Sequence, residues 1–184
     1  GTRLEFWTGN SNAAIAERVR IVADGTVVAP LGVCLGTAID GQAAANTLAD
    51  YEEGTFTPAF TGSGGTSGQS YDIQVGVYTK VGKMVTASGY ITLSDKGSIS
   101  NTLYLSGFPF TTRNISNSHA AVAFARVEAW NLADDHTLTA HMGTNGTIAT
   151  FTSYAGGTSS HVTLATAQVT NTSSIMFTAT YNTT

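Results

Sequence analysis

The chain has 184 residues and a formal net charge of −4, and only 11% of its residues are charged, against roughly 25% in an ordinary soluble domain. This length suits one compact domain with a short extension, or two small units. The chain contains no run of Lys or Arg and no apolar stretch as long as a membrane span, so nucleic-acid binding and membrane insertion are not expected.

Because charges are so few, the polar surface must come from uncharged side chains. Thirty Thr and 20 Gly residues, with many Ser and Asn, can supply it. Thr favours strands because its branched Cβ fits a pleated surface, whereas Gly and Asn tolerate the positive φ of tight turns. The composition therefore predicts β structure with many short turns. The single cysteine, Cys34, excludes an intrachain disulfide and is expected to be a small buried hydrophobe.

The first 45 residues predict a short N-terminal stalk built from β-hairpins. Residues 17–22 alternate, with Val19 and Ile21 on one face, and a turn at Asp24-Gly25 leads into a return strand. Such small hairpins bury too little to be stable alone and need a neighbour. Residues 36–46 are small and polar, which predicts a linker or a single helical turn, so we place a domain boundary after residue 45. The chain begins with Gly rather than Met, and we expect a fragment or a processed product.

Residues 46–184 carry a sustained strand pattern and are predicted to form the main domain. We expect a first strand at 56–60, a loop at 61–70, and a hairpin of strands 71–78 and 84–93. The second arm of this hairpin has its apolar residues on one face, namely Val85, Ala87, Ile91 and Leu93. On the next strand Leu103 and Leu105 are expected to face inward, with Tyr104 on the opposite side.

The C-terminal third continues this pattern. The Ala content of residues 119–130 would permit a helix, but the even spacing of Val122, Phe124 and Trp130 favours a strand. Strands are also predicted at 137–142 and 147–154. The last strand has alternating apolar positions Ile175, Phe177, Ala179 and Tyr181. Eight or nine strands at this spacing predict an all-β fold, with an antiparallel β-sandwich or jelly-roll knob at 46–184.

Several segments resemble the distal domain of bacteriophage tail fibres. They are NTLADYEEGTFTP at 46–58, GVYTKVG at 76–82, GFPF at 107–110 and IMFTATY at 175–181, while ERVRI at 17–21 is similar to repeats of the fibre shaft. The resemblance covers most of residues 46–184. It implies a trimeric appendage of the virion whose distal domain meets the host surface. The implied partners are two further copies of the chain, the upstream fibre or other virion proteins, and a host cell-surface glycan or protein.

The trimer also has a physical argument. A surface with so few charges leaves strand edges open to uncontrolled pairing, and burying those edges around a threefold axis removes that hazard. Assembly would also give the small N-terminal hairpins a neighbour.

No constellation of residues predicts catalysis or metal binding. Glu52-Glu53 and Asp134-Asp135 are the adjacent carboxylate pairs, but neighbours on a strand point to opposite faces, and glycan hydrolysis needs two facing carboxyls. We expect Glu52 to begin a turn at the rim. His136 and His141 are five residues apart, also on opposite faces. No catalytic residue, metal site or cofactor is therefore predicted, and the chain is not expected to be an enzyme.

Carbohydrate recognition usually combines exposed aromatic rings with hydroxyl and amide groups. Trp130, Tyr154 and Tyr104 are the candidates for stacking on a sugar, although Trp130 is somewhat more readily explained as a core residue. Three functions stay open: non-catalytic attachment to a host receptor, a structural role as a head fibre or capsid decoration, and enzymatic degradation of glycans. The first is preferred.

Overall fold

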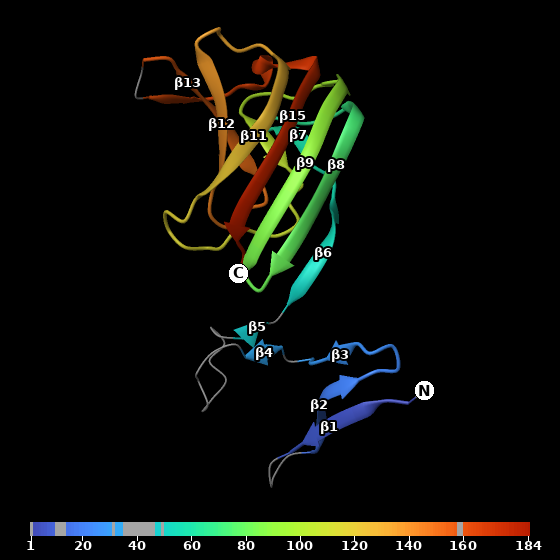
Figure 1. Cartoon of the computed structure of the whole chain (residues 1–184). Helices are drawn as coiled ribbons and strands as arrows, with labels where there is room; N and C mark the ends of the chain where they lie inside the picture. Colours follow the sequence, from blue (N-terminus) through green and yellow to red (C-terminus); the bar gives the residue numbers. More distant parts are fainter. Residues whose placement is uncertain (1, 10–13, 31, 35–46, 49, 158–159) are drawn as a thin grey trace. The chain divides into compact units, whose positions relative to one another are not determined.

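The computed structural model describes residues 2–9, 14–30, 32–34, 47–48, 50–157 and 160–184. The predictions for residues 36–46 and for the side chain of Cys34 lie outside the described residues. The chain divides into two compact units, Gly1–Tyr51 and Glu52–Thr184. The described residues are almost all in strands, loops and turns, with one 3₁₀ turn, η2, at Thr166–Gln168 (Figure 1). The predicted all-β class is confirmed. Among the described residues, no helix has the length and apolar character that a membrane span requires.

The N-terminal unit contains two small antiparallel sheets. One has three strands in the order β1-β2-β3 and the other pairs β4 with β5. The strands are β1 (Leu4–Thr8), β2 (Ala16–Ile21), β3 (Val27–Val28), β4 (Val33–Cys34) and β5 (Thr47–Leu48). The predicted turn joins β2 to β3: the Asp24 carboxylate accepts a hydrogen bond from the Thr26 amide at 2.9 Å. That bond lowers the pKa of Asp24, and Gly25 takes a φ of 87°.

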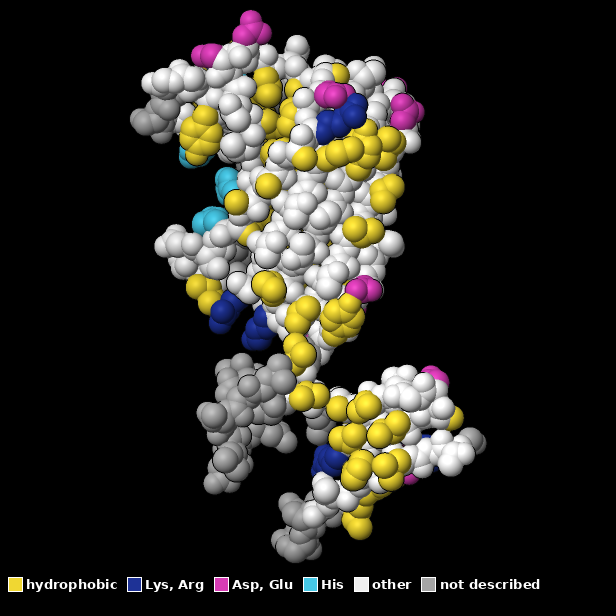
Figure 2. All heavy atoms as spheres, in the orientation of Figure 1, with side chains coloured by type: hydrophobic (Ala, Val, Ile, Leu, Met, Phe, Trp, Pro, Cys, Tyr) yellow, Lys and Arg dark blue, Asp and Glu magenta, His cyan; other side chains and the backbone are white. Residues whose placement is uncertain are grey.

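One face of the three-stranded sheet is apolar. Leu4 lies opposite Ile21, which lies opposite Val27, and Phe6 lies opposite Val19, so all five side chains share a face. None of the described side chains of this unit is buried. Figure 2 shows hydrophobic side chains gathered on one face of the unit. These hairpins therefore form by local pairing, and their described side chains do not build a buried core.

The C-terminal unit is built on one large, curled antiparallel sheet. Its strand order is β6-β8-β9-β15-β11-β12-β13-β10-β7, and β14 pairs with β13. The strands are β6 (Tyr51–Phe56), β7 (Ala59–Gly62), β8 (Ser70–Val81), β9 (Met84–Asp95), β10 (Leu103–Ser106), β11 (Ala120–Trp130), β12 (His136–Met142), β13 (Ala149–Ala155), β14 (His161–Thr163) and β15 (Val169–Asn182). The strand prediction for 119–130 is confirmed by β11.

The two end strands of this sheet are neighbours in the sequence. β6 and β7 are separated only by Thr57 and Pro58, so the sheet curls until its ends approach each other. The Gln74 side-chain amide of β8 donates to the Pro58 carbonyl at 3.0 Å, and the Phe60 amide of β7 donates to the Tyr71 hydroxyl of β8 at 3.2 Å. The prediction of one continuous strand at 56–60 was wrong, because Pro58 has no N–H to donate to a ladder. The turn expected at Glu52 was wrong too, since Glu52 lies inside β6.

The core follows the alternation read from the sequence. The eight predicted core positions on β9 and β15 are all buried: Val85, Ala87, Ile91, Leu93, Ile175, Phe177, Ala179 and Tyr181. The predicted inward pair on β10, Leu103 and Leu105, is also fully buried. The hydroxyl of Tyr181 accepts a hydrogen bond from the Phe110 amide at 3.3 Å, and burial raises the pKa of Tyr181 to about 12. Period-two burial thus specifies which face of each long strand packs inward.

Candidate functional site

The surface of the C-terminal unit is hollowed at one of its ends. The chain enters this unit at Glu52, whose carboxylate accepts a hydrogen bond from Tyr78 near the β8–β9 turn. Thr183, beyond the end of β15, donates to Lys83 in that same turn, at 2.8 Å. Trp130 pairs with Val169 at the opposite end of β15. We call this opposite end the distal end.

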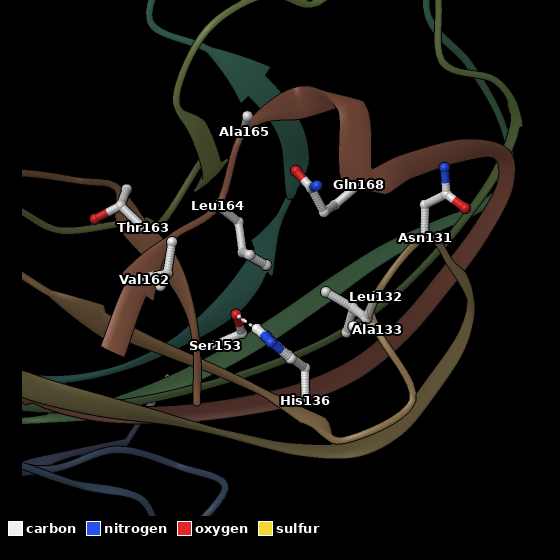
Figure 3. Close-up of a pocket in the computed structure, with 10 residues that line it drawn as sticks. All are labelled: Asn131, Leu132, Ala133, His136, Ser153, Val162, Thr163, Leu164, Ala165 and Gln168. Atoms are coloured by element: carbon white, nitrogen blue, oxygen red, sulfur yellow. Dashed lines mark hydrogen bonds between the residues drawn. The ribbon is translucent and has the colours of Figure 1, made fainter. Parts of the chain in front are cut away.

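Two adjoining hollows lie at the distal end, around the loop 131–135 that joins β11 to β12. The first, which we call the η2 hollow, has a volume of about 320 Å³ and is lined by Asn131, Leu132, Ala133, His136, Ser153, Val162, Thr163, Leu164, Ala165 and Gln168 (Figure 3). The second, the Trp130 hollow, has a volume of about 470 Å³ and is lined by Phe124, Val127, Ala129, Trp130, Leu132, His136, Thr137 and Leu138. Leu132 and His136 belong to both.

Irregular backbone in β11 places the loop 131–135. The pairing of β11 with β15 shifts register twice, the second time between Glu128 and Trp130, and Ala129 takes a φ of 58°. That conformation is unfavourable for a residue with a Cβ. The carbonyl of Ala129 accepts hydrogen bonds from the hydroxyls of Thr170 and Ser173, each at 2.7 Å, which holds the bulge in place. The Asn131 amide then donates to the Gln168 carbonyl at 2.8 Å and joins the loop to η2.

Few polar groups interrupt the apolar wall of the η2 hollow. Nδ1 of His136 and the hydroxyl of Ser153, a residue only 1% exposed, are 2.9 Å apart (Figure 3). Nε2 of His136 lies 3.8 Å from a carboxylate oxygen of Asp135. The side-chain oxygen of Gln168 is buried and has no hydrogen-bond partner among the described residues. The hollow thus combines apolar side chains with the polar side chains of Asn131, His136 and Thr163, whereas the buried Gln168 oxygen is not accessible from it.

Trp130 belongs both to the core and to a hollow. Its ring centroid lies 5.5 Å from that of Phe60 and 5.3 Å from that of Phe151, and its indole N–H donates to the Ser174 carbonyl at 3.2 Å. The ring is only partly buried and lines the Trp130 hollow. A ligand there would meet a ring whose orientation is already determined by packing.

The other two predicted aromatic residues lie elsewhere. Tyr154 follows buried Ser153 on β13, so it points to the outer face; it is 42% exposed, and its ring lies 5.8 Å from that of His161. Tyr104, between buried Leu103 and Leu105, also faces outward. Neither tyrosine lines the two hollows, so the structure does not gather the three candidates into one site.

Sequence reasoning missed the residues that shape the η2 hollow. Leu132, Leu164 and Gln168 meet there because β11, β14 and η2 converge at the distal end, although they are far apart in the chain. The interruption of the strand pattern at residues 131–135 indicated a loop. The local sequence pattern did not indicate that Gln168 lies beside this loop.

The carboxylates and histidines are spread over both ends of the unit. The hydroxyl of Tyr78 is 2.5 Å from Glu52, and this hydrogen bond is the main cause that raises the pKa of Tyr78. Asp134 lies in the distal loop. His141 has its ring 5.7 Å from that of His119; burial lowers the pKa of His141, and the nearby His119 and His161 lower it further. Among the described residues, no group of three or more His, Cys, Asp or Glu could hold a metal ion.

No known protein family matches the sequence, and no curated protein shows significant similarity to it. The fold, however, occurs in part of a solved phage structure. The crystal structure of the Dettilon tailspike protein (gp208) superposes on 72% of this chain with a TM-score of 0.58 and 18% sequence identity. The match spans only 24% of the tailspike chain. At this identity the likeness establishes a shared fold and leaves membership of the tail-fibre family a prediction.

Proposed function

We propose that this chain is a distal part of a bacteriophage tail fibre or tailspike, located in the virion, and that it attaches the particle to a glycan on the host surface. The fold shared with part of a tailspike protein is the observation that carries this proposal. The two hollows support it, because they open at the end of the C-terminal unit opposite the one at which the chain enters. In a fibre, that end is free to meet a cell.

The walls of the hollows suit an uncharged sugar. Sugars present apolar C–H faces together with hydroxyl and amide groups, and small-molecule sites combine an apolar lining with a few polar groups that fix orientation. The Trp130 ring offers a flat apolar surface, and Asn131, His136 and Gln168 offer hydrogen-bonding groups. Tyr154, which is exposed on the outer face, stays a candidate for contacts with a longer glycan.

We further propose that the chain works as a homotrimer. The apolar face of Leu4, Phe6 and Ile21 in the N-terminal unit has no core to cover it within the described chain, and further copies would remove it from water. In the C-terminal unit, the outer face of β9 and β15 is nearly uncharged (Figure 2). It carries cross-strand hydroxyl pairs such as Ser88–Thr178 at 3.0 Å. Under this proposal the curled sheet is the sandwich or jelly-roll knob and residues 1–45 are its stalk.

Trimerisation would make weak sites sufficient. Three identical sites on one appendage raise the effective concentration of the second contact, so avidity can exceed the affinity of one site by about 10²–10⁴. We therefore propose binding without cleavage. The competing function is glycan hydrolysis, which is favoured by one observation: Asp134 and Asp135 lie in the loop that borders both hollows. Hydrolysis would need two carboxyls facing each other about 5–10 Å apart across the sugar.

The test is attachment of the fluorescently labelled chain to a panel of bacteria. We expect binding to a subset of strains and competition by the purified surface polysaccharide of a bound strain, whose size distribution stays unchanged after incubation. The variants Asp134→Asn and Glu52→Gln should attach as the wild type does. Progressive shortening of the polysaccharide would show hydrolysis instead, and failure to attach to every strain would contradict the proposed function.

A further inference from the structure

The outer face of β8 is apolar and partly exposed. Continuous pairing with β9 determines the register of this strand from Ile73 to Val81. In this register the side chain of Val75 is 56% exposed and that of Val77 is 51% exposed. Ile73 and Val81, two further β-branched residues, share the same face. A row of aliphatic side chains left in water is unfavourable and is typical of a surface that contacts a partner.

The inner face of the same strand carries polar residues instead. Lys80 lies opposite Val85 and is only 6% exposed, and its Nζ is 5.4 Å from the centre of the Phe110 ring. Gln74 also faces inward, where its side-chain amide donates to the Pro58 carbonyl. A shift of the strand by one residue would bury the valines and expose the lysine. The observed register therefore does not maximise apolar burial within one chain, and this is expected where a partner buries the outer face.

The neighbouring strands β9 and β15 extend this face without adding a charge. The three strands run side by side, and β9 and β15 each place five outward residues beside the five of β8 (Figure 1). Val75, for example, lies beside Tyr90, which lies beside Met176. None of these outward residues is Asp, Glu, Lys, Arg or His. We call the outward residues of β8, β9 and β15 the uncharged face.

We propose that the uncharged face is the surface on which a second copy of this chain packs, a proposal that rests on the homotrimer in the proposed function. Identical copies bring identical charges, so a face without charges can meet another copy without like-charge repulsion. The side chains of Val75 and Val77 form no hydrogen bonds. They therefore suit the apolar centre of a protein interface better than a sugar.

The size of the uncharged face is consistent with one part of a stable interface. With strands about 4.8 Å apart and a rise of about 3.4 Å per residue, the face covers roughly 450 Å². A stable interface buries about 800 Å² on each partner. The apolar face of the N-terminal unit would supply further contact area in the same assembly, so the copies are expected to use both faces.

The experiment is oxidation of the purified full chain by hydrogen peroxide, followed by peptide mass spectrometry and run beside sedimentation equilibrium. Met84 and Met176 lie on the uncharged face, and Met142 is fully buried in the core. Ile148 is 40% exposed and lies outside the face, so Ile148→Met supplies an exposed reference methionine. We expect Met84 and Met176 of the assembled chain to react at least about fivefold more slowly than this reference.

Val77→Glu places a carboxylate in the proposed contact. Because Val77 is half exposed in a single chain, the fold should persist and Met142 should stay unreactive. The reaction of Met84 should accelerate to within about twofold of the reference, even if other contacts keep the copies together. Val75→Lys should act in the same way, which excludes an effect of negative charge alone. Ile148→Glu, the matched control, should retain both the assembled mass and the protection of the two methionines.

The outcomes separate this inference from the proposed function. An assembled wild type whose Met84 and Met176 react as fast as the reference would overturn the inference and leave the trimer standing. Protection that survives both Val77→Glu and Val75→Lys would overturn it as well. A monomeric wild type would overturn the inference together with the trimer. Failure to attach to every strain, with the protection intact, would contradict attachment alone. If a variant does not fold, Met142 becomes reactive, and the comparison within the wild-type assembly still decides.

Discussion

Phe177 on β15 lies directly opposite Gly89 on β9, and its ring occupies the space where any larger residue at position 89 would place its side chain. A Cβ built on Gly89 would lie 2.5 Å from Cζ of Phe177, closer than real Cβ atoms approach other atoms. The aromatic side chain of one central strand is therefore matched to a missing side chain on the next.

Gly89→Ala should destabilise the C-terminal unit by about 1–3 kcal/mol, because the buried Phe177 ring can move only by disturbing its neighbours. Denaturant unfolding at a fixed protein concentration measures this loss. Gly143→Ala is the control, since a Cβ there meets nothing within 4 Å and should change stability by less than about 1 kcal/mol. Equal effects of the two substitutions would show that Phe177 does not constrain position 89.

Substitutions of Trp130 and Tyr154 should have different effects: the first should lower the stability of the fold, and the second should lower attachment to cells. Trp130→Ala removes ring contacts with Phe60 and Phe151 and the hydrogen bond to Ser174, and should reduce the free energy of unfolding by about 2–4 kcal/mol. Tyr154→Ala, at an exposed position, should reduce it by less than about 1 kcal/mol while lowering attachment to cells. Thermal and denaturant unfolding, run beside the cell-attachment assay, distinguish the two. A Trp130→Ala variant as stable as Tyr154→Ala would contradict the core assignment.

Phe6→Glu should weaken self-association. Phe6 is 53% exposed on the apolar face of the N-terminal sheet, and a carboxylate buried between copies at this face would be strongly unfavourable. Sedimentation equilibrium should give three times the mass of one chain for the wild type and a lower mass for the variant. The control Thr2→Glu adds the same charge at an exposed position before β1 and should leave the trimer intact. A monomeric wild type would contradict the trimer directly.

Stability should fall as the solution is acidified, and His141 should cause part of that fall. Its pKa in the folded chain is below the ordinary 6.5 because of burial and the neighbouring His119 and His161, so the unfolded chain takes up this proton first as pH decreases. The free energy of unfolding should therefore decrease as pH falls through about 6.5, until His141 is protonated in the folded chain too. The slope is at most about 1.4 kcal/mol per pH unit, and less here because solvent screens the partly exposed ring.

Urea unfolding of the wild type and of His141→Gln, measured between about pH 7.5 and about pH 5, checks this dependence. The variant should show a smaller slope, and His119→Gln should show a partial reduction because one repulsive neighbour is lost. Identical slopes in the wild type and His141→Gln would rule out this contribution.

The long strands could be predicted because a curled sheet buries one face of each, which imposes a period of two on the sequence. Ile175, Phe177, Ala179 and Tyr181 show that period without interruption, and all four are buried. At residues 56–60 the same reasoning failed. Phe56 and Phe60 have matching parity, yet Pro58 separates two strands that lie at opposite ends of the sheet order.

The candidate site could be predicted only where it coincides with the core. Trp130 was identifiable as a large aromatic residue at the end of a strand pattern. The partnership of His136 with Ser153, and the approach of Gln168 to both, depend on strand pairing between distant segments. No local periodicity reports such pairing. The side-chain oxygen of Gln168 is left without a hydrogen-bond partner only when the loops have come together in the fold. Short-range sequence patterns therefore could not have predicted it.

The position of β15 has a consequence for synthesis. β15 is the last strand in chain order, yet it lies in the middle of the sheet between β9 and β11. Residues leave the ribosome in order. The edges of β9 and β11 that pair with β15 therefore keep their backbone N–H and C=O groups unpaired until residues 169–182 emerge. A nascent chain that terminates before residue 169 cannot close its sheet, and its open edges invite aggregation or proteolysis. The C-terminal unit therefore cannot reach its folded state in a chain that ends before residue 169, because β9 and β11 then lack the strand that joins them.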